Sequence, residues 1–136
     1  MLITKIFTIL QVGNMYRTGD IVCVSYGDFN GDKRVGIFLI LYNEKQDRSY
    51  SSNHTNVVCA KLTTNNFQGD SYVVRLYKGD SGLQDDCFVN LSKLHTFTYE
   101  RIYKRIGNLE SSRMVKIYKE LQKFHNEMEA QLMELF

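Results

Sequence analysis

Val35-Gly36-Ile37-Phe38-Leu39-Ile40-Leu41-Tyr42-Asn43 is a nearly unbroken apolar run, rich in branched and aromatic side chains. It is too short and too rich in β-forming residues for a buried helix, so it predicts a strand that is covered on both faces. Loop-forming residues flank the run, Asn30-Gly31-Asp32 before it and residues 43–53 after it. We therefore expect the other strands of the fold to be arranged around this one.

The bulk composition suits a single folded domain. The chain has 136 residues, of which 43% are hydrophobic and 24% are charged, and that length supports one core. No apolar run in the sequence reaches the length of a transmembrane helix, so we expect no membrane partner. The net charge of +2 does not indicate a nucleic-acid-binding protein by itself, and an RNA or DNA site would have to be a local basic patch.

The first residues are expected to lie outside this domain. Residues 1–14 hold a short apolar stretch and one lysine, but no small-residue cleavage site of a signal peptide follows. Met15 begins a segment that resembles a natural start. We interpret residues 1–14 as a dispensable N-terminal extension and residues 15–136 as one cytoplasmic domain. One alternative stays open, that apolar residues of the extension add a strand or cover a sheet edge: Ile6, Phe7 and Ile9.

Cysteine and histidine usage gives no indication of a metal site or a cofactor. Cys23, Cys59 and Cys87 are an odd number and form no Cys-x-x-Cys pair, which argues against a disulfide framework or a zinc site. Each lies in a predicted strand, so we expect small buried hydrophobic side chains in a reducing compartment. The three histidines are too dispersed along the sequence to predict a metal site.

Short apolar segments separated by turn residues predict a mainly β fold. The expected strands are residues 21–26, 35–43, 56–62, 72–77 and 86–96, with a last short strand at 103–106 as a further candidate. Strands of this length and spacing are typical of a compact antiparallel barrel. A single helical turn is expected at residues 98–101, with Thr98 as its N-cap.

The periodicity changes near the C-terminus. An amphipathic helix is predicted from about residue 110 to residue 135, with Ser111 or Ser112 as its cap, because apolar positions recur at alternating spacings of four and three: Met114, Tyr118, Leu121, His125, Met128, Leu132 and Leu135. The stripe exceeds what a small barrel needs, so it either covers the barrel or pairs with another subunit. The expected class is mainly β with a C-terminal helix, an α+β fold.

The order of these segments resembles the MazF/PemK/Kid-like toxins of type II toxin–antitoxin systems, as a divergent member. Gly19-Asp20-Ile21-Val22 resembles the family's opening Gly-Asp motif, and Phe38 to Asn43 resembles its apolar strand that ends in Asn. The segment from Val57 to Thr63 is similar to the family's next strand, with Lys61 in place of a proline. Residues 82–109 follow the family's later pattern without a gap.

The resemblance covers residues 17 to about 123. It implies an SH3-like antiparallel barrel, a homodimer, cleavage of single-stranded RNA without metal or cofactor, and inhibition by an antitoxin peptide. Thr63 falls on the family's catalytic threonine. The family's catalytic arginine falls on Gly36, whereas Arg34 lies two residues upstream, on the same face of an extended strand. The family's later Gln and Arg fall on Lys93 and His95.

Three residues are candidate catalytic groups, each with a simpler structural alternative. Arg34 would stabilise negative charge on the scissile phosphate, or it is a solvated loop cation. The Thr63 hydroxyl would donate to a phosphate oxygen, or it caps the turn at the end of its strand. His95 would carry a proton, since the ordinary pKa of histidine is about 6.5, or it is a half-exposed strand residue.

Four basic residues are candidate RNA contacts: Lys33, Arg48, Lys61 and Lys93. Aromatic residues near them in the sequence would offer stacking faces for bases, namely Tyr26, Phe29, Tyr50 and Phe67. Ordinary loop composition is the simpler interpretation of both groups.

Two functions from different classes therefore stand side by side. The first is an endoribonuclease toxin that cleaves single-stranded RNA without metal and is held by an antitoxin. The second is a catalytically inactive PemK-like binding protein that acts as a regulator or inhibitor on a protein or nucleic-acid partner, for instance one carried by a mobile element. The loss of arginine at Gly36 favours the second, and the retained Thr63 favours the first. A generic SH3-like nucleic-acid-binding module is a third, weaker alternative.

Overall fold

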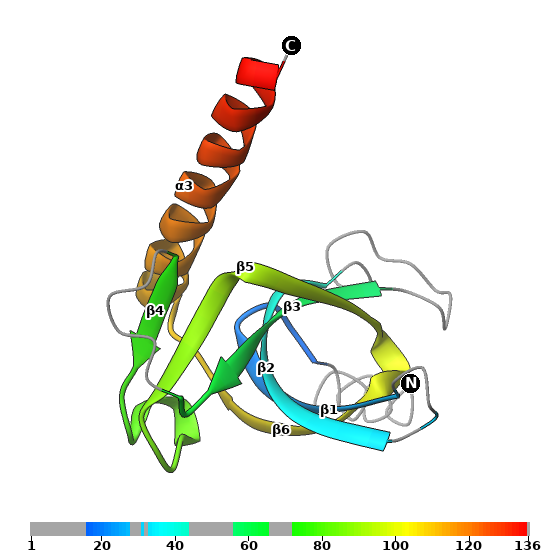
Figure 1. The fold of residues 1–136 in the computed structure, drawn as a ribbon. Coiled ribbons are helices and arrows are strands. Elements are labelled where there is room, and N and C mark those ends of the chain that lie inside the picture. Colours follow the sequence, from blue (N-terminus) through cyan, green and yellow to red (C-terminus); the bar gives the residue numbers. More distant parts are fainter. Residues whose placement is uncertain (1–15, 28–30, 32, 44–55, 66–71, 136) are drawn as a thin grey trace, which may run out of the picture.

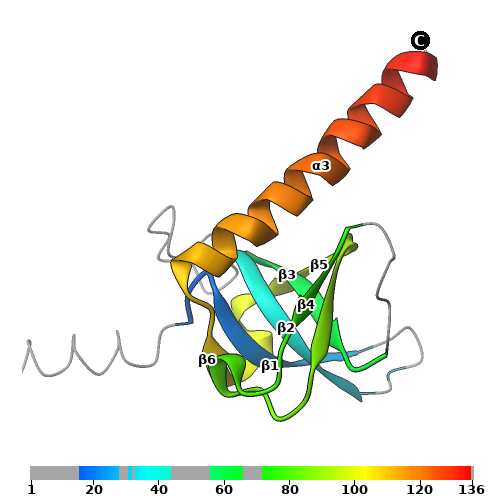
Figure 2. The same ribbon diagram turned by 90° about the vertical axis from the view of Figure 1, so that its left-hand side faces the viewer.

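A curled antiparallel sheet and one long helix form the fold (Figure 1, Figure 2). The computed structural model describes residues 16–27, 31, 33–43, 56–65 and 72–135. The strands are β1 Asp20–Gly27, β2 Lys33–Asn43, β3 Asn56–Thr63, β4 Val73–Leu76, β5 Cys87–Thr98 and β6 Ile102–Asn108. Two 3-10 turns and a helix complete the chain: η1 Asp80–Gly82, η2 Tyr99–Arg101 and α3 Ser111–Leu135. Residues 1–14 lie outside the described part, so their role as an extension stays a prediction.

The sheet order is β4-β5-β3-β2-β1-β6, and every neighbouring pair is antiparallel. β2 pairs with β1 on one side and with β3 on the other. The predicted class, mainly β with a C-terminal helix, is confirmed, and residues 103–106 do lie in a strand, β6.

β2 is buried on both of its faces, as its sequence predicts. Successive side chains of a strand point to opposite faces. Leu39 and Leu41 therefore join one core cluster, which also contains the start of α3, while Phe38 and Ile40 join a second cluster on the other face. The side chains of Phe38, Leu39 and Ile40 are all 0% exposed.

α3 packs against the barrel with its first half and projects beyond it with its second half (Figure 2). Met114 and Ile117 are buried, and the Tyr118 hydroxyl donates to the Leu41 carbonyl oxygen at 2.6 Å. Further along, Met128 and Leu132 are exposed. The predicted stripe thus covers the barrel and also extends past it. Within the described residues, no helix has both the length and the apolar character needed to cross a membrane.

Two predicted helix caps differ from the structure. α3 already includes both serines, because the amides of Arg113 and Met114 donate to the Glu110 carbonyl, which places the cap one residue before Ser111. Thr98 does stand at the N-cap position of η2, but its side chain makes no capping hydrogen bond. A 3-10 turn this short is held by its two flanking strands, so it forms without the side-chain cap.

All three cysteines lie in strands and are free thiols, but they are not equally buried. Cys59 and Cys87 are buried, whereas Cys23 is only half-buried. Burial raises the pKa of the Cys59 thiol to about 12, so this side chain is an unreactive core residue. The expectation of burial thus holds for two of the three.

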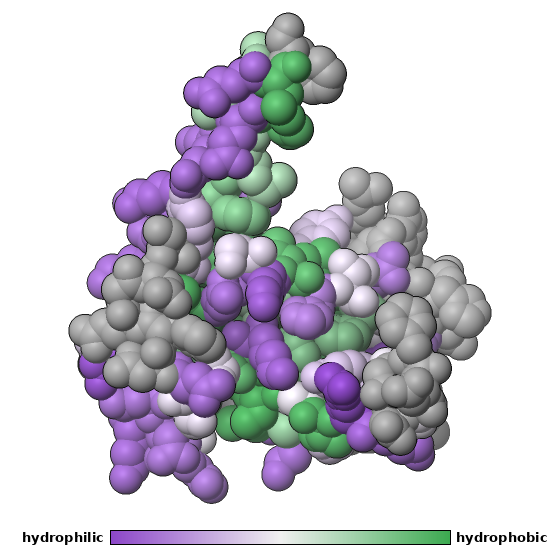
Figure 3. Space-filling view, viewed as in Figure 1, coloured by the Kyte–Doolittle hydropathy of each residue, from purple (hydrophilic) through white to green (hydrophobic). Residues whose placement is uncertain are grey.

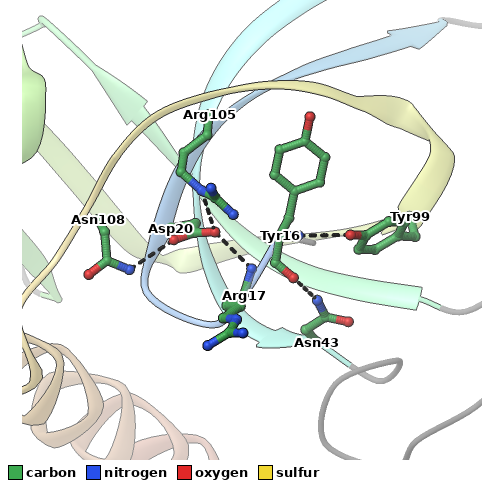
Figure 4. Close-up of polar contacts among 7 residues, drawn as sticks. All are labelled: Tyr16, Arg17, Asp20, Asn43, Tyr99, Arg105 and Asn108. Carbon is green, nitrogen blue, oxygen red and sulfur yellow. Dashed lines mark hydrogen bonds and ion pairs between the residues drawn. The ribbon is translucent and has the colours of Figure 1, made fainter. Parts of the chain in front are cut away.

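A buried carboxylate ties the start of β1 to the end of β6 (Figure 4). Asp20 is 3% exposed. Its Oδ2 accepts hydrogen bonds from the Arg105 Nε and the Arg17 amide, each at 2.8 Å, and its Oδ1 accepts from the Asn108 Nδ2 at 2.8 Å. The fully buried Asn43 at the end of β2 donates to the Tyr16 carbonyl oxygen. The Gly-Asp and terminal Asn motifs therefore act as structural ties.

Asp20→Ala should lower the free energy of unfolding by about 3 kcal/mol or more, because the buried donors lose a charged acceptor. Urea unfolding of both proteins measures the difference. Asp86→Ala is the matched control, since the Asp86 carboxylate accepts from the Arg75 side chain and the Lys78 amide at an exposed position, where an ion pair contributes little. Equal effects of the two substitutions would contradict the assignment of Asp20 as a structural tie.

Candidate active site

A register jump between β3 and β5 opens a polar hollow beside β2. The two strands pair as far as Ala60 with Leu94, and the next pair is Leu62 with Val89. Between these two pairs β3 has one residue, Lys61, whereas β5 has four, residues 90–93. An irregularity of this kind bends a strand and redirects its side chains.

The hollow measures about 200 Å³ and is lined by six polar residues: Lys61, Thr63, Asn65, Asn90, Lys93 and His95. Four of these are candidates from the sequence, two proposed as catalytic and two as RNA-binding. The structure brings them together from β3 and β5. The sequence analysis missed the two asparagines. Asn65 could have been found from the sequence, because it follows Thr63 in a turn-forming segment. No neighbouring residue in the sequence indicates that Asn90 lies near Thr63.

Asn90 supports the irregular part of β5 from within. Its side-chain Oδ1 accepts hydrogen bonds from the Ser92 amide at 3.0 Å and from the Ser92 hydroxyl at 2.6 Å. Short local bonds of this type compete with the regular ladder of a sheet. They therefore stabilise the path of residues 90–93 where these residues leave the ladder with β3, and with it the shape of the hollow.

Thr63 ends β3 and combines both roles that its position suggests. Its Oγ1 accepts a hydrogen bond from the Asn65 amide at 3.2 Å, so it does support the turn. A hydroxyl group is both an acceptor and a donor. Because Oγ1 is the acceptor in its hydrogen bond with the Asn65 amide, the hydroxyl proton of Thr63 can be donated to an anion in the hollow.

His95 lies at the border between the hollow and an aromatic cluster. Its imidazole stacks on the Phe97 ring, with centroids 5.8 Å apart and planes 7° apart, and meets the Phe38 ring edge-on at 5.3 Å. Burial, together with the positive charges of Lys61 and Lys93, lowers the pKa of His95 from its ordinary value. The imidazole is therefore neutral at neutral pH and able to accept a proton.

Two of the remaining basic candidates, Lys33 and Arg34, lie elsewhere. Lys33 and Arg34 are exposed at the start of β2, where they pair with Gly27 and Tyr26 of β1. The described residues that line the hollow include neither of them, and Arg48 lies outside the described residues. The roles proposed for Lys33 and Arg34 stay predictions that the geometry of the hollow does not support, and the role proposed for Arg48 stays an untested prediction.

Gly36 lies under an aromatic ring. The pairing of Ile37 with Leu62 brings Gly36 alongside Thr63 on the neighbouring strand. A Cβ atom at position 36 would lie 2.8 Å from the Phe38 Cε2 and 3.5 Å from the Tyr26 Cε1. The Phe38 ring therefore occupies the space that a side chain at position 36 would need.

A larger hollow, of about 440 Å³, lies on the far side of the β3 end. Thr64, Cys23 and Cys87 are among its lining residues. Burial first, and then the charges of Asp85 and Asp86, raise the pKa of the Cys87 thiol, which makes it a poor nucleophile. In the described part of the chain, no group of His, Cys, Asp and Glu side chains is arranged to hold a metal ion. The smaller hollow thus has the better set of reactive groups.

Comparison with known protein families shows to which family this chain is related. The sequence profile of the "PemK-like, MazF-like toxin of type II toxin-antitoxin system" matches residues 17–125. The chain belongs to this family. The resemblance found in the sequence motifs is thereby confirmed. Comparison with curated protein sequences gives no match.

Solved structures of PemK-like and MazF-like toxins share the fold. A mycobacterial endoribonuclease in complex with its cognate antitoxin is 20% identical, with a TM-score of 0.62 over 82% of this chain and 96% of that one. The Mycobacterium tuberculosis toxin MazF-mt6 is 19% identical, with a TM-score of 0.61 over 79% of this chain and 96% of that one. At such identity the likeness extends to the fold only.

The pKa of His95 should lie below about 6.5, and Lys61→Ala and Lys93→Ala should each raise it without lifting it above that value, because burial is the larger cause. NMR titration of the imidazole, assigned with His95→Gln, measures this. Since the unfolded chain binds the proton more readily, the wild type should lose more stability than His95→Gln as the pH falls from about 7 to 5. A pKa above the ordinary value would contradict the proposed environment.

Proposed function

We propose that this chain is an endoribonuclease toxin that cleaves single-stranded RNA in the cytoplasm without metal, and that the smaller hollow is its active site. One observation carries the proposal: the hollow gathers Thr63, His95, Lys61 and Lys93 from segments far apart in the sequence. Family membership and the shared fold of solved mycobacterial endoribonucleases support it.

Side chains of the hollow can fill two roles in the reaction. His95, neutral at neutral pH, takes the proton of the ribose 2′-hydroxyl as its oxygen attacks phosphorus. Thr63 donates a hydrogen bond to a non-bridging phosphate oxygen, on which charge develops in the transition state. The bond from phosphorus to the 5′-oxygen breaks, that oxygen takes a proton from water, and His95 returns the proton it accepted to the solvent. The products are a 2′,3′-cyclic phosphate and a 5′-hydroxyl.

A second function, RNA or protein binding without cleavage, is favoured by one observation. The family's catalytic arginine position is Gly36, and the Phe38 ring occupies the space above it. In that case the same basic hollow would bind a single strand through its lysines and the half-buried rings of Tyr26 and Phe97. Cleavage activity of the purified wild type separates the two functions.

An antitoxin peptide is the proposed protein partner. A toxin of this fold has been solved in complex with its cognate antitoxin, and the family name describes a two-component system. We propose that an antitoxin binds this chain and blocks its activity.

We also propose that the chain forms a homodimer through α3, with the apolar side of the projecting half of each helix packed against the first half of the partner's helix. Figure 3 shows this part of the helix with one apolar side and one hydrophilic side. Leu132 is 52% exposed and Leu135 is 77% exposed. A continuous apolar side of this kind usually marks an interface.

The charges of α3 favour an antiparallel pairing of two helices. The first half carries the basic residues and the second half the acidic ones: Arg113, Lys116, Lys119 and Lys123, then Glu127, Glu129 and Glu134. Glu120 is the exception, and it pairs with Lys123 at 2.9 Å. In an antiparallel pair the basic half of one helix lies against the acidic half of the other, whereas a parallel pair opposes like charges.

Thr63→Ala and His95→Gln should each slow cleavage of a long single-stranded RNA by about 10²-fold to 10³-fold, with no effect of EDTA. Gel analysis of the RNA fragments under single-turnover conditions measures the rate. Thr64→Ala is the matched control, because Thr64 is exposed and lines the other hollow. A wild-type protein that cuts no RNA at high concentration would refute the enzyme and leave the binding function.

Leu132→Glu should convert the dimer to a monomer, because it places a charge in the apolar interface. Sedimentation at micromolar protein concentration measures the mass. Ala130→Glu adds the same charge roughly 200° around the helix and should leave the dimer intact. A wild-type protein that sediments only as a monomer would contradict the pairing.

A further inference from the structure

We propose that Lys61 and Lys93, rather than an arginine, supply the positive charge that binds the scissile phosphate in this chain. The inference rests on the proposed ribonuclease function and assigns the cations of its active site. It differs from the arrangement that the family resemblance implies, in which an arginine at position 36 has this task.

The aromatic cluster excludes the family arrangement. A Cβ atom at position 36 would lie 2.8 Å from the Phe38 ring. That ring is 0% exposed and is held by edge contacts with Tyr26 at 5.9 Å, with Phe97 at 4.9 Å and with His95 at 5.3 Å. The ring therefore cannot move aside without disturbing the core beneath the hollow.

Lys61 brings a cation to the same place from the neighbouring strand. It pairs directly with Phe38 of β2, so the two side chains lie on the same face of the sheet. It also lies two residues before Thr63 on β3, again on that face. In the family pattern this position is a proline, so the chain has gained a positive charge beside the position where the arginine is lost.

Lys93 approaches from the opposite side of the hollow. It belongs to residues 90–93 of β5, which stand opposite Lys61 because of the register jump. Both lysines are exposed, so their ammonium groups stay hydrated and reach a phosphate entering the hollow. The charges of both also lower the pKa of His95. The same pair of cations thus attracts the phosphate and adds to the lowering of the His95 pKa, of which burial is the larger cause.

The proposal is tested by separating kcat from KM for the full-length chain on a long single-stranded RNA. Lys61→Ala and Lys93→Ala should each lower kcat/KM by about 10²-fold to 10³-fold, with a fall in kcat from lost charge stabilisation in the transition state and a rise in KM from weaker phosphate binding. Arg34→Ala should change kcat by less than about tenfold. Lys104→Ala is the matched control, because this exposed lysine lines the other hollow. The thermal midpoints should stay unchanged, since all four side chains are exposed.

Two results would overturn the inference while leaving the ribonuclease intact. The first is a fall in kcat of about 10²-fold in Arg34→Ala with normal kcat in both lysine variants. The second is a gain of about tenfold or more in Gly36→Arg, which would show that the arginine arrangement is still accessible. Failure of the wild type to cut RNA would instead refute the proposed function itself, so the two failures are distinguishable.

Discussion

Burial of β2 on both faces is the constraint on which the rest of the structure depends. A strand in this position has no water for its backbone groups, so β1 and β3 must pair with its two edges. Both faces of β2 also need apolar side chains packed against them, and a single flat sheet cannot supply these. The sheet therefore curls around Phe38 and Ile40, while the start of α3 joins the cluster that covers Leu39 and Leu41.

The proposed active site lies where this regular arrangement is interrupted. Between the pair of Ala60 with Leu94 and the pair of Leu62 with Val89, residues 90–93 leave the ladder with β3, while Asn90 still pairs with Val73 of β4. The released residues present Asn90 and Lys93 to the hollow, and the bonds from Ser92 to Asn90 stabilise their path. The chemistry of the hollow thus depends on the register jump between β3 and β5.

Charged groups of the chain divide into structural and functional sets by their burial. The Asp20 carboxylate is enclosed and its donors are fixed, so the Arg105 guanidinium is committed to the fold. Lys61 and Lys93 are exposed around a half-buried imidazole. Their charge is therefore available to a ligand, and their field acts on His95 because the aromatic rings of Phe38 and Phe97 limit its access to water.

The sequence by itself determined the elements and the family. Patterns of burial and turn chemistry are local, so the strand at 35–43, its two-sided cover and the C-terminal helix follow from neighbouring residues, and Thr63 follows from its motif. The tertiary structure alone decided which polar residues meet. Strand register is a long-range property: the pairing of Cys59 with His95 brings His95 near Lys61, and the jump that follows brings Lys93 there. Arg34 lies instead at the exposed start of β2. Likewise, only the packed position of the Phe38 ring shows why position 36 has no room for a side chain.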